Sequence, residues 1–178
     1  GCNATYHNSR VIVTNSSITS TVQTNNLAST LIQDSVLGTS ISLGSINATL
    51  RDSEISGRLY TDIVNLNIYD VKKLGGISKY NGQECEYATI DNVTFTSNID
   101  IDGVSINITD SYFSSSVTIT HNYVNITNVS SDSSLNIVSA NYAALNNVTV
   151  SSNLQGTVEY LYLEDVQTGY GSGTLNIG

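Results

Sequence analysis

The stretch Asn107-Ile108-Thr109-Asp110-Ser111-Tyr112-Phe113 contains a five-position phrase: an aliphatic residue, any residue, Asn or Asp, Ser or Val, and any residue. We call the Asn or Asp of each phrase the corner. The phrase recurs at steps of 18 to 22 residues, with its nine corners at Asn15, Asp34, Asp52, Asp70, Asn92, Asp110, Asn128, Asn147 and Asp165. A near-constant period over the whole chain indicates stacked, similar units. The sequence therefore predicts a solenoid.

Within each unit apolar and polar residues alternate, as in Val104, Ile106 and Ile108. This is the period of a β-strand, and the abundant Val, Ile, Thr and Tyr fit a pleated surface better than a helix. A unit of ~18 residues cannot bury its own inner face, so its strands must pair with equivalent strands above and below. We expect an all-β domain of about nine rungs with parallel sheets, on the order of 40 Å long at strand spacing.

The alternation breaks at each corner, because the positions two before, one after and three after it all have inward character. Ile108, Ser111 and Phe113 are the example around Asp110. Asn and Asp tolerate the left-handed conformation that such a turn requires. We expect corner side chains to point inward and to form hydrogen bonds up the column. A second inward pair follows most corners and completes three short strands per rung: Ile41 and Leu43, Ile99 and Ile101, Val117 and Ile119, Leu135 and Ile137.

The phrases at 89–95 and 107–113 resemble the repeat of right-handed parallel β-helix proteins, the pectin-lyase-like superfamily. The resemblance covers residues 11–178 and implies a right-handed coil. A left-handed β-helix would show a six-residue sub-period, and a β-sandwich would not keep so constant a step. The superfamily includes lyases, hydrolases, phage tailspikes, adhesins and structural proteins, so the resemblance leaves the function open.

We predict one domain, with an N-terminal tail over residues 1–10 and the β-helix over residues 11–178. The longest step contains a predicted loop insertion at 72–87, where Gly and Lys cluster. No amphipathic helix or polar terminal rung covers either end in the sequence pattern, so the predicted rod lacks terminal caps.

Composition argues against several partners. The chain has 6 Lys+Arg against 15 Asp+Glu, a net charge of −9, and only 12% charged residues. This acidic balance disfavours nucleic acid and anionic membranes, and no apolar run is long enough to span a bilayer. Abundant Ser, Thr, Asn and Tyr suit an extracellular surface. A chain that starts with Gly1 and lacks Met predicts a processed, secreted protein, although a recombinant product would look the same.

Cys2 and Cys85 are the only cysteines. In a secreted chain we expect them to form a disulfide, within one chain or between neighbours, in preference to two free thiols.

Eight Asn-X-Ser/Thr sequons mark candidate sites of N-glycosylation. We favour four of them, which lie in the tail, near a strand start or on outward strand positions: Asn107, Asn125, Asn47 and Asn3. The other four are corners, where an inward side chain could not carry a glycan: Asn15, Asn92, Asn128 and Asn147.

Catalysis is not expected. The resemblance implies that an enzyme of this type would cluster Asp with Arg, Lys or His on one outer sheet, and here the basic residues are scattered. Asp100 and Asp102 form the best acidic pair. These two carboxylates could form a calcium site or a general acid/base pair, or they could simply belong to a solvated strand face. We favour the solvated strand face. The sequence predicts no cofactor and no metal.

The chain ends carry the functional prediction. Apolar residues enter the first rung and the last rung without a cover, so open strand edges invite another chain. The predicted polymer interface comprises Val11, Ile12, Val13, Leu175 and Ile177. We expect the chain to bind itself head to tail as the subunit of an extracellular, glycosylated cell-surface filament. In composition it is similar to Ser/Thr/Asn/Tyr-rich surface proteins of archaea.

Two alternatives remain. A carbohydrate-binding adhesin or tailspike-like module would carry outward ladders of tyrosine, whereas a small polysaccharide lyase lacks the necessary basic residues. We expect no single tyrosine column from Tyr60, Tyr69, Tyr112, Tyr123, Tyr142, Tyr160, Tyr162 and Tyr170.

Overall fold

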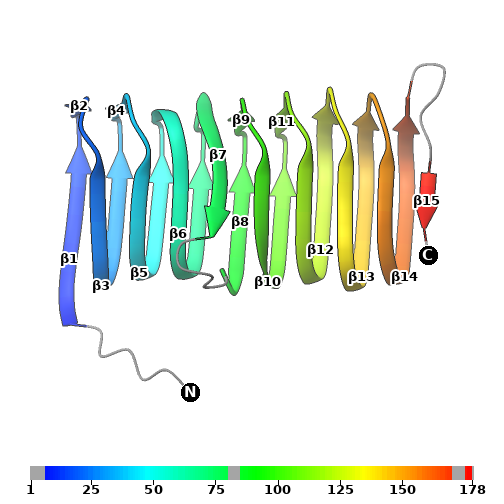
Figure 1. Ribbon diagram of the computed structural model, residues 1–178, viewed down its shortest axis with the longest axis horizontal. Coiled ribbons are helices and arrows are strands. Elements are labelled where there is room, and N and C mark those ends of the chain that lie inside the picture. The colour runs from blue at the N-terminus through cyan, green and yellow to red at the C-terminus, as the bar shows by residue number, and fades with distance from the viewer. Residues whose placement is uncertain (1–6, 80–84, 170–174, 178) are drawn as a thin grey trace.

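The computed structural model describes residues 7–79, 85–169 and 175–177, and all of its regular elements are strands (Figure 1). They pair in parallel in one continuous ladder, which confirms the predicted all-β parallel solenoid. The fifteen strands are β1 His7–Thr14, β2 Ser17–Ile18, β3 Val22–Gln33, β4 Val36–Leu37, β5 Ile41–Arg51, β6 Glu54–Tyr69, β7 Lys73–Lys79, β8 Tyr87–Asp91, β9 Thr94–Phe95, β10 Ile99–Thr109, β11 Tyr112–Phe113, β12 Val117–Ser131, β13 Leu135–Val150, β14 Leu154–Thr168 and β15 Leu175–Ile177.

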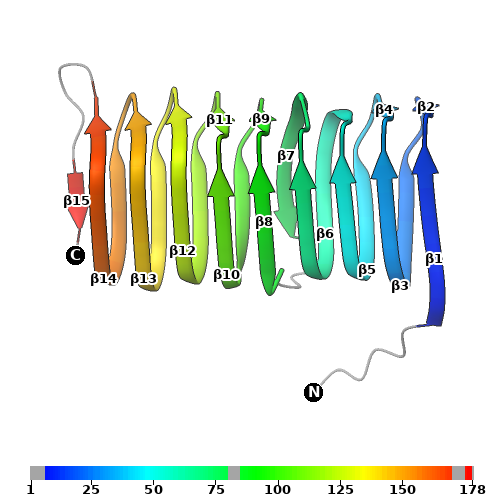
Figure 2. The same cartoon turned by 180° about the vertical axis from the view of Figure 1, so that it is seen from behind.

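The register follows the corners. Ile108 pairs with Ile126, Ile126 with Leu145, and Leu145 with Leu163, each two residues before its corner. Nine corners delimit about eight complete turns of roughly 18 residues. Seen from either side, the strands stand side by side along a rod, with β1 at one end and β14 and β15 at the other (Figures 1 and 2). The hand of the coil stays a prediction.

A narrow apolar core runs along the rod axis. Ile108 and Phe113, two before and three after a corner, are completely buried, and Ser111 between them is nearly so. The Phe95 and Phe113 rings stack with their centroids 5.3 Å apart. The second inward pairs, from Ile41 and Leu43 to Leu135 and Ile137, are buried as well. Truncating one of these large side chains to Ala would cost about 2–5 kcal/mol.

All nine predicted corners adopt the left-handed conformation, with φ between 49° and 54°. The prediction that their side chains point inward is wrong, because every corner side chain is exposed. The left-handed residue reverses the strand alternation, so the residues two before and one after both face the core. The corner side chain itself is left on the outside of the bend.

Two predicted boundaries shift. β1 begins at His7, so residues 7–10 belong to the first strand and not to the tail. Within the predicted insertion at 72–87, Lys73–Lys79 is a strand of the rod, with Leu74 and Ile77 completely buried. Gly75 permits this packing, because a Cβ there would lie 2.3 Å from the Gly57 carbonyl oxygen. The Gly-Gly pair therefore marks a close approach between rungs and not a loop.

Candidate interaction surfaces

The corner side chains form an exposed column along one edge of the rod. The amide of Asn92 donates to Asp70 Oδ1 at 2.8 Å, and Asn128 donates to Asp110 Oδ1 at 2.9 Å. Asn147 continues the pattern by donating to Asn128 Oδ1 at 3.0 Å. In each pair the later corner donates to the earlier one, so the hydrogen bonds run in a fixed direction along the rod.

Three consecutive corners are Asp and have no amide, so none of them donates to the corner before it. Asp34, Asp52 and Asp70 stand one above another and, with Lys72 and Asn92, line an open groove of about 610 Å³. Neighbouring strands lie about 4.8 Å apart, and like charges directly opposite on adjacent strands are destabilising. This part of the column is therefore a strip of negative charge.

The position directly after each corner is always Ser or Val, and its buried surroundings explain this restriction. Ser35 accepts a hydrogen bond at Oγ from the Ser16 backbone N–H at 3.2 Å and donates to the Gln33 carbonyl at 2.7 Å. Ser53 repeats the arrangement one rung on, accepting from the Ser35 N–H. Valine at the same position, as in Val93 and Val148, fills the core instead. Both residue types suit this buried position beside the bend, because Ser forms hydrogen bonds with backbone groups and Val packs against apolar side chains.

The register reveals a tyrosine column that the sequence prediction missed. Tyr123 pairs with Tyr142 and Tyr142 with Tyr160 on three successive strands, β12, β13 and β14. Tyr87 occupies the same column, separated from Tyr123 by Ser105. All four rings are exposed, Tyr160 by 64%. The eight tyrosines considered from the sequence do not share one column, but three of them, Tyr123, Tyr142 and Tyr160, do. The available signal was position, because each tyrosine of this column lies five residues before its corner.

The gap at Ser105 forms a groove on this tyrosine face. The groove has a volume of about 400 Å³, and its polar lining includes Ser105, Asn107, Tyr123, Asn125 and Tyr142. The Asn125 amide donates to Asn107 Oδ1 at 2.9 Å. An aromatic wall beside fixed amide and hydroxyl groups offers both stacking and hydrogen bonding to a ligand.

One more tyrosine extends the face toward the end of the rod. Tyr162 is exposed in the column of Asn125 and donates from its hydroxyl to Glu164 Oε2 at 3.1 Å. The Asn146 amide donates to the same oxygen at 2.6 Å. The hydrogen bond and the charge of Glu164 raise the pKa of Tyr162.

The sequons occupy solvent-facing positions in the described residues. Asn47 and Asn125 are exposed and Asn107 is half-buried, whereas Asn3 lies outside the described residues. The corners Asn15, Asn92, Asn128 and Asn147 are exposed as well, which removes the reason for ranking them lower. Glycosylation at every one of these sites stays a prediction.

Cys85 lies in the core and not in a projecting loop. It is 2% exposed, its thiol contacts the Tyr87 carbonyl at 3.6 Å, and burial raises its pKa to about 12. Cys2 lies outside the described residues, so the disulfide stays a prediction. Forming it would require the tail to enter the core or the Cys85 side chain to leave it.

His121 is an unusual core residue next to Cys85. It is 1% exposed, and the Cys85 backbone is a polar neighbour of its ring. Burial lowers its pKa to about 4. The ring occupies space left by Gly103, where a Cβ would lie 3.1 Å from His121 Nε2. We interpret His121 as a neutral packing residue.

On β10, Asp100 and Asp102 are in register with Thr118 and Thr120. Asp100 is exposed, whereas Asp102 is half-buried and its Oδ1 is shielded from solvent. Across the described ranges, no three His, Cys, Asp or Glu side chains come together as a possible metal site. The absence of catalysis stays a prediction.

The described rungs at the two ends leave apolar columns open. Leu163 is 37% exposed, although Leu145 in the same column one rung earlier is completely buried. At the opposite end Val13 is half-buried and Ile12 is 52% exposed. Among the described strands, β1 pairs with β3 alone. The predicted interface residues Leu175 and Ile177 lie in β15, which pairs with β14.

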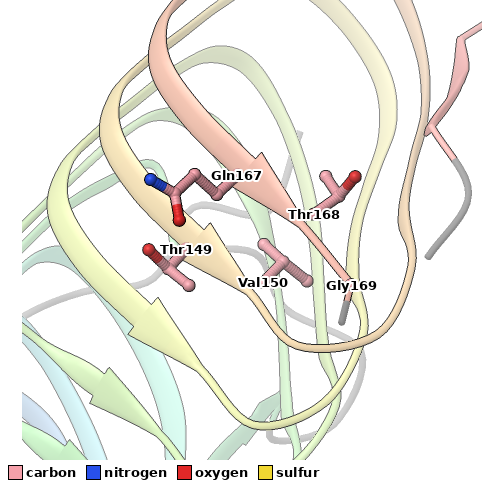
Figure 3. Close-up of a pocket in the computed structure, with 5 residues that line it drawn as sticks. All are labelled: Thr149, Val150, Gln167, Thr168 and Gly169. Carbon is pink, nitrogen blue, oxygen red and sulfur yellow. The ribbon is translucent and has the colours of Figure 1, made fainter. Parts of the chain in front are cut away.

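A small cavity lies at the β14 end (Figure 3). It has a volume of about 90 Å³ and is lined by Thr149, Val150, Gln167, Thr168 and Gly169. Thr168 occupies the inward column that holds Val150 one rung earlier.

Charge is distributed unevenly along the sequence. All six Lys and Arg residues fall within residues 10–79, and residues 1–79 contain five Asp or Glu, a formal charge of +1. The remaining ten carboxylates lie in residues 80–178, which have neither Lys nor Arg, a formal charge of −10. The C-terminal half of the rod is therefore much more negatively charged than the N-terminal half.

Together, these features define a parallel β-solenoid with an exposed aromatic face and with its negative charge concentrated toward the C-terminal end. Nothing matches this chain in comparisons with protein-family models, curated proteins and solved structures. In the part of the chain that the structure describes, no helix is long and apolar enough to cross a membrane.

Proposed function

We propose that this protein is a structural subunit that polymerises head to tail into an extracellular filament on a cell surface. The observation that carries the proposal concerns the two end rungs of the described chain: their apolar columns are partly exposed, and their outer strand edges, apart from the pairing of β14 with β15, have no partner among the described residues. Open edges of this kind template pairing with another strand. A second copy, stacked along the axis, supplies the matching edge.

The symmetry of the contact follows from the parallel ladder. Each rung pairs with the next in one direction only, so the two ends of the rod present different surfaces. A contact between different surfaces does not close on itself when it continues along a straight axis. The expected product is an open filament, and N-glycans on its outward sequons would keep neighbouring filaments apart.

Sedimentation of the purified protein tests this proposal. A subunit of 19.0 kDa that polymerises should give a broad series of fast-sedimenting species, whose average size grows with protein concentration. A single species of constant mass across a hundredfold range of concentration would overturn the proposal.

A second candidate function is carbohydrate binding, and the tyrosine column favours it. Tyr87, Tyr123, Tyr142 and Tyr160 present exposed rings on one face. Rigid aromatic rings with polar tips supply large contact area at low entropic cost. A polysaccharide chain lying along the rod would meet successive rings and the groove at Ser105.

Binding to an immobilised glycan panel tests this second function. Tyr142→Ala should reduce binding by tenfold or more, since it removes both a ring and part of the groove wall. Tyr60, exposed but outside the column, provides the matched control variant Tyr60→Ala. Equal binding by both variants, or no binding by the wild type, would argue against the proposal.

A further inference from the structure

We infer that the filament joint continues the corner register from one copy to the next, so that β1 of a second copy pairs in parallel with β14 of the first and Asn15 lies over Asp165. This inference rests on the proposed filament and specifies its contact residue by residue. It follows from extending the observed ladder by one rung, with every residue of β1 kept in its own column.

The corner pair is the first reason. Within the rod, a corner Asn donates to the Asp of the preceding rung, as Asn92 does to Asp70 and Asn128 to Asp110. The last corner, Asp165, is exposed, and the first corner, Asn15, is exposed at the other end. In the continued register the Asn15 amide reaches Asp165 in this same donor–acceptor order. If two copies met through like ends, Asn15 and Asp165 would not lie opposite each other.

Charge gives a second reason. Arg10 pairs with Ser29 in the column that contains the exposed tyrosines, so in the joint it meets Tyr160. A guanidinium over an exposed tyrosine ring is attractive, and Glu159 is the exposed neighbour of that ring. No Asp or Glu occurs before Asp34, whereas the β14 rung contains Glu159, Glu164 and Asp165. The joint therefore places the acid-free end of one copy on the acidic end of the next.

The apolar columns give a third reason. Ile12 is 52% exposed and would cover Tyr162, while Val13 would cover Leu163. Ile18, three residues after the first corner, falls in the column of Thr168 at the rim of the small cavity shown in Figure 3. Each of these exposed or half-buried apolar side chains at one end thus meets an exposed or cavity-lining position at the other.

The backbone of the ends is compatible with this contact. Among the described residues, β15 pairs with β14 at Leu154, Gln155 and Gly156. The part of β14 that β1 would cover, from Tyr160 to Glu164, has no further partner strand among the described residues. A second copy could therefore add β1 without displacing β15.

Disulfide trapping tests the register. Thr14 and Glu164 are exposed and would lie directly opposite across the joint, at a Cα separation of about 5 Å, which suits a disulfide. The variant Thr14→Cys/Glu164→Cys, in a Cys2→Ser background, should form covalent ladders under mild oxidation. The control Thr14→Cys/Asn146→Cys places the second thiol one rung away and should form few cross-links.

A charge exchange at the corner gives an independent test. Asn15→Asp should raise the protein concentration needed for assembly roughly tenfold, because two carboxylates then face each other. Adding Asp165→Asn should restore assembly, since the amide again meets a carboxylate. Asp52→Asn, the same chemical change inside the rod, controls for altered folding, and thermal unfolding of each variant checks that it is folded.

The outcomes separate the two proposals. Two results would overturn this register but not the filament proposal. In the first, filaments form but the thiols at positions 14 and 164 do not cross-link. In the second, assembly is the same for the wild type, Asn15→Asp and Asn15→Asp/Asp165→Asn. An absence of any assembly by the wild-type protein would overturn both.

Discussion

At the scale of single residues, each corner combines a left-handed backbone with a side chain that stays in solvent. The backbone conformation explains the restriction to Asn and Asp, which tolerate positive φ better than other residues with a Cβ. The side chain adds a second role when it is Asn, because its amide donates to the corner before it. Asp at consecutive corners cannot do this and places like charges in a line.

We therefore expect Asp52→Asn to stabilise the protein by about 0.5–1 kcal/mol. The substitution removes the middle of three stacked carboxylates and supplies an amide donor to Asp34. Denaturant unfolding of the monomer measures the change. The reverse substitution Asn128→Asp should destabilise by a similar amount, because it breaks the hydrogen bond to Asp110. A destabilised Asp52→Asn variant would contradict this account of the column.

Gly103 tests close packing between rungs. A Cβ at this position would lie 1.9 Å from the Cys85 carbonyl oxygen, so Gly103→Ala must displace backbone. We expect a loss of about 3 kcal/mol or more in unfolding free energy. In the control Gly38→Ala the nearest atom lies 3.8 Å away, and the change should stay within about 0.5 kcal/mol. Similar effects of the two substitutions would mean that this approach is loose.

At the scale of the elements, the sequence identified which strand positions face the core. The inward positions around each corner, such as Ile108 and Phe113, were predictable because the corner fixes their phase. The strand Lys73–Lys79 was not, since its Gly-Gly pair has the composition of a loop and only the neighbouring Gly57 backbone explains it. Asn26, with φ 53°, was also missed because this bend does not recur in the other described rungs.

The surfaces were less predictable than the core. The tyrosine column was within reach of the sequence, but it requires that Tyr123, Tyr142 and Tyr160 be aligned on their corners and not on one another. The outward direction of the corner side chains was not predictable from the sequence. A break in the alternation indicates a bend, but it does not determine whether the residue at the bend faces the core or the solvent.

His121 makes one rung sensitive to pH. Burial lowers its pKa to about 4 from an ordinary value of 6.5, so the unfolded chain binds a proton more readily between these values. Its neutral form favours the folded state above pH 6.5. We expect this contribution to decrease as pH falls from about 6.5 toward 4.

Comparison with His121→Leu isolates this contribution from the many carboxylates. The difference in unfolding free energy between the two proteins should change with pH across this window and stay constant above it. A difference independent of pH between 4 and 7 would show that the His121 imidazole titrates normally.

At the scale of the whole molecule, the rod has direction in its strand pairing, in its corner hydrogen bonds and in its charge. The half formed by residues 1–79 has a formal charge of +1, and residues 80–178 have a charge of −10. Two acidic halves repel, so stacking of unlike ends is the arrangement that the charges favour. The open apolar columns at both ends favour the same arrangement.

Electron microscopy of the native protein, without denaturant or reductant, tests the central claim most directly. Head-to-tail stacking predicts long, unbranched fibres with an axial repeat of about 40–45 Å, which corresponds to nine rungs at strand spacing. Discrete particles at every protein concentration would contradict the filament. Fibres with an unrelated repeat would contradict continuation of the ladder from one copy to the next.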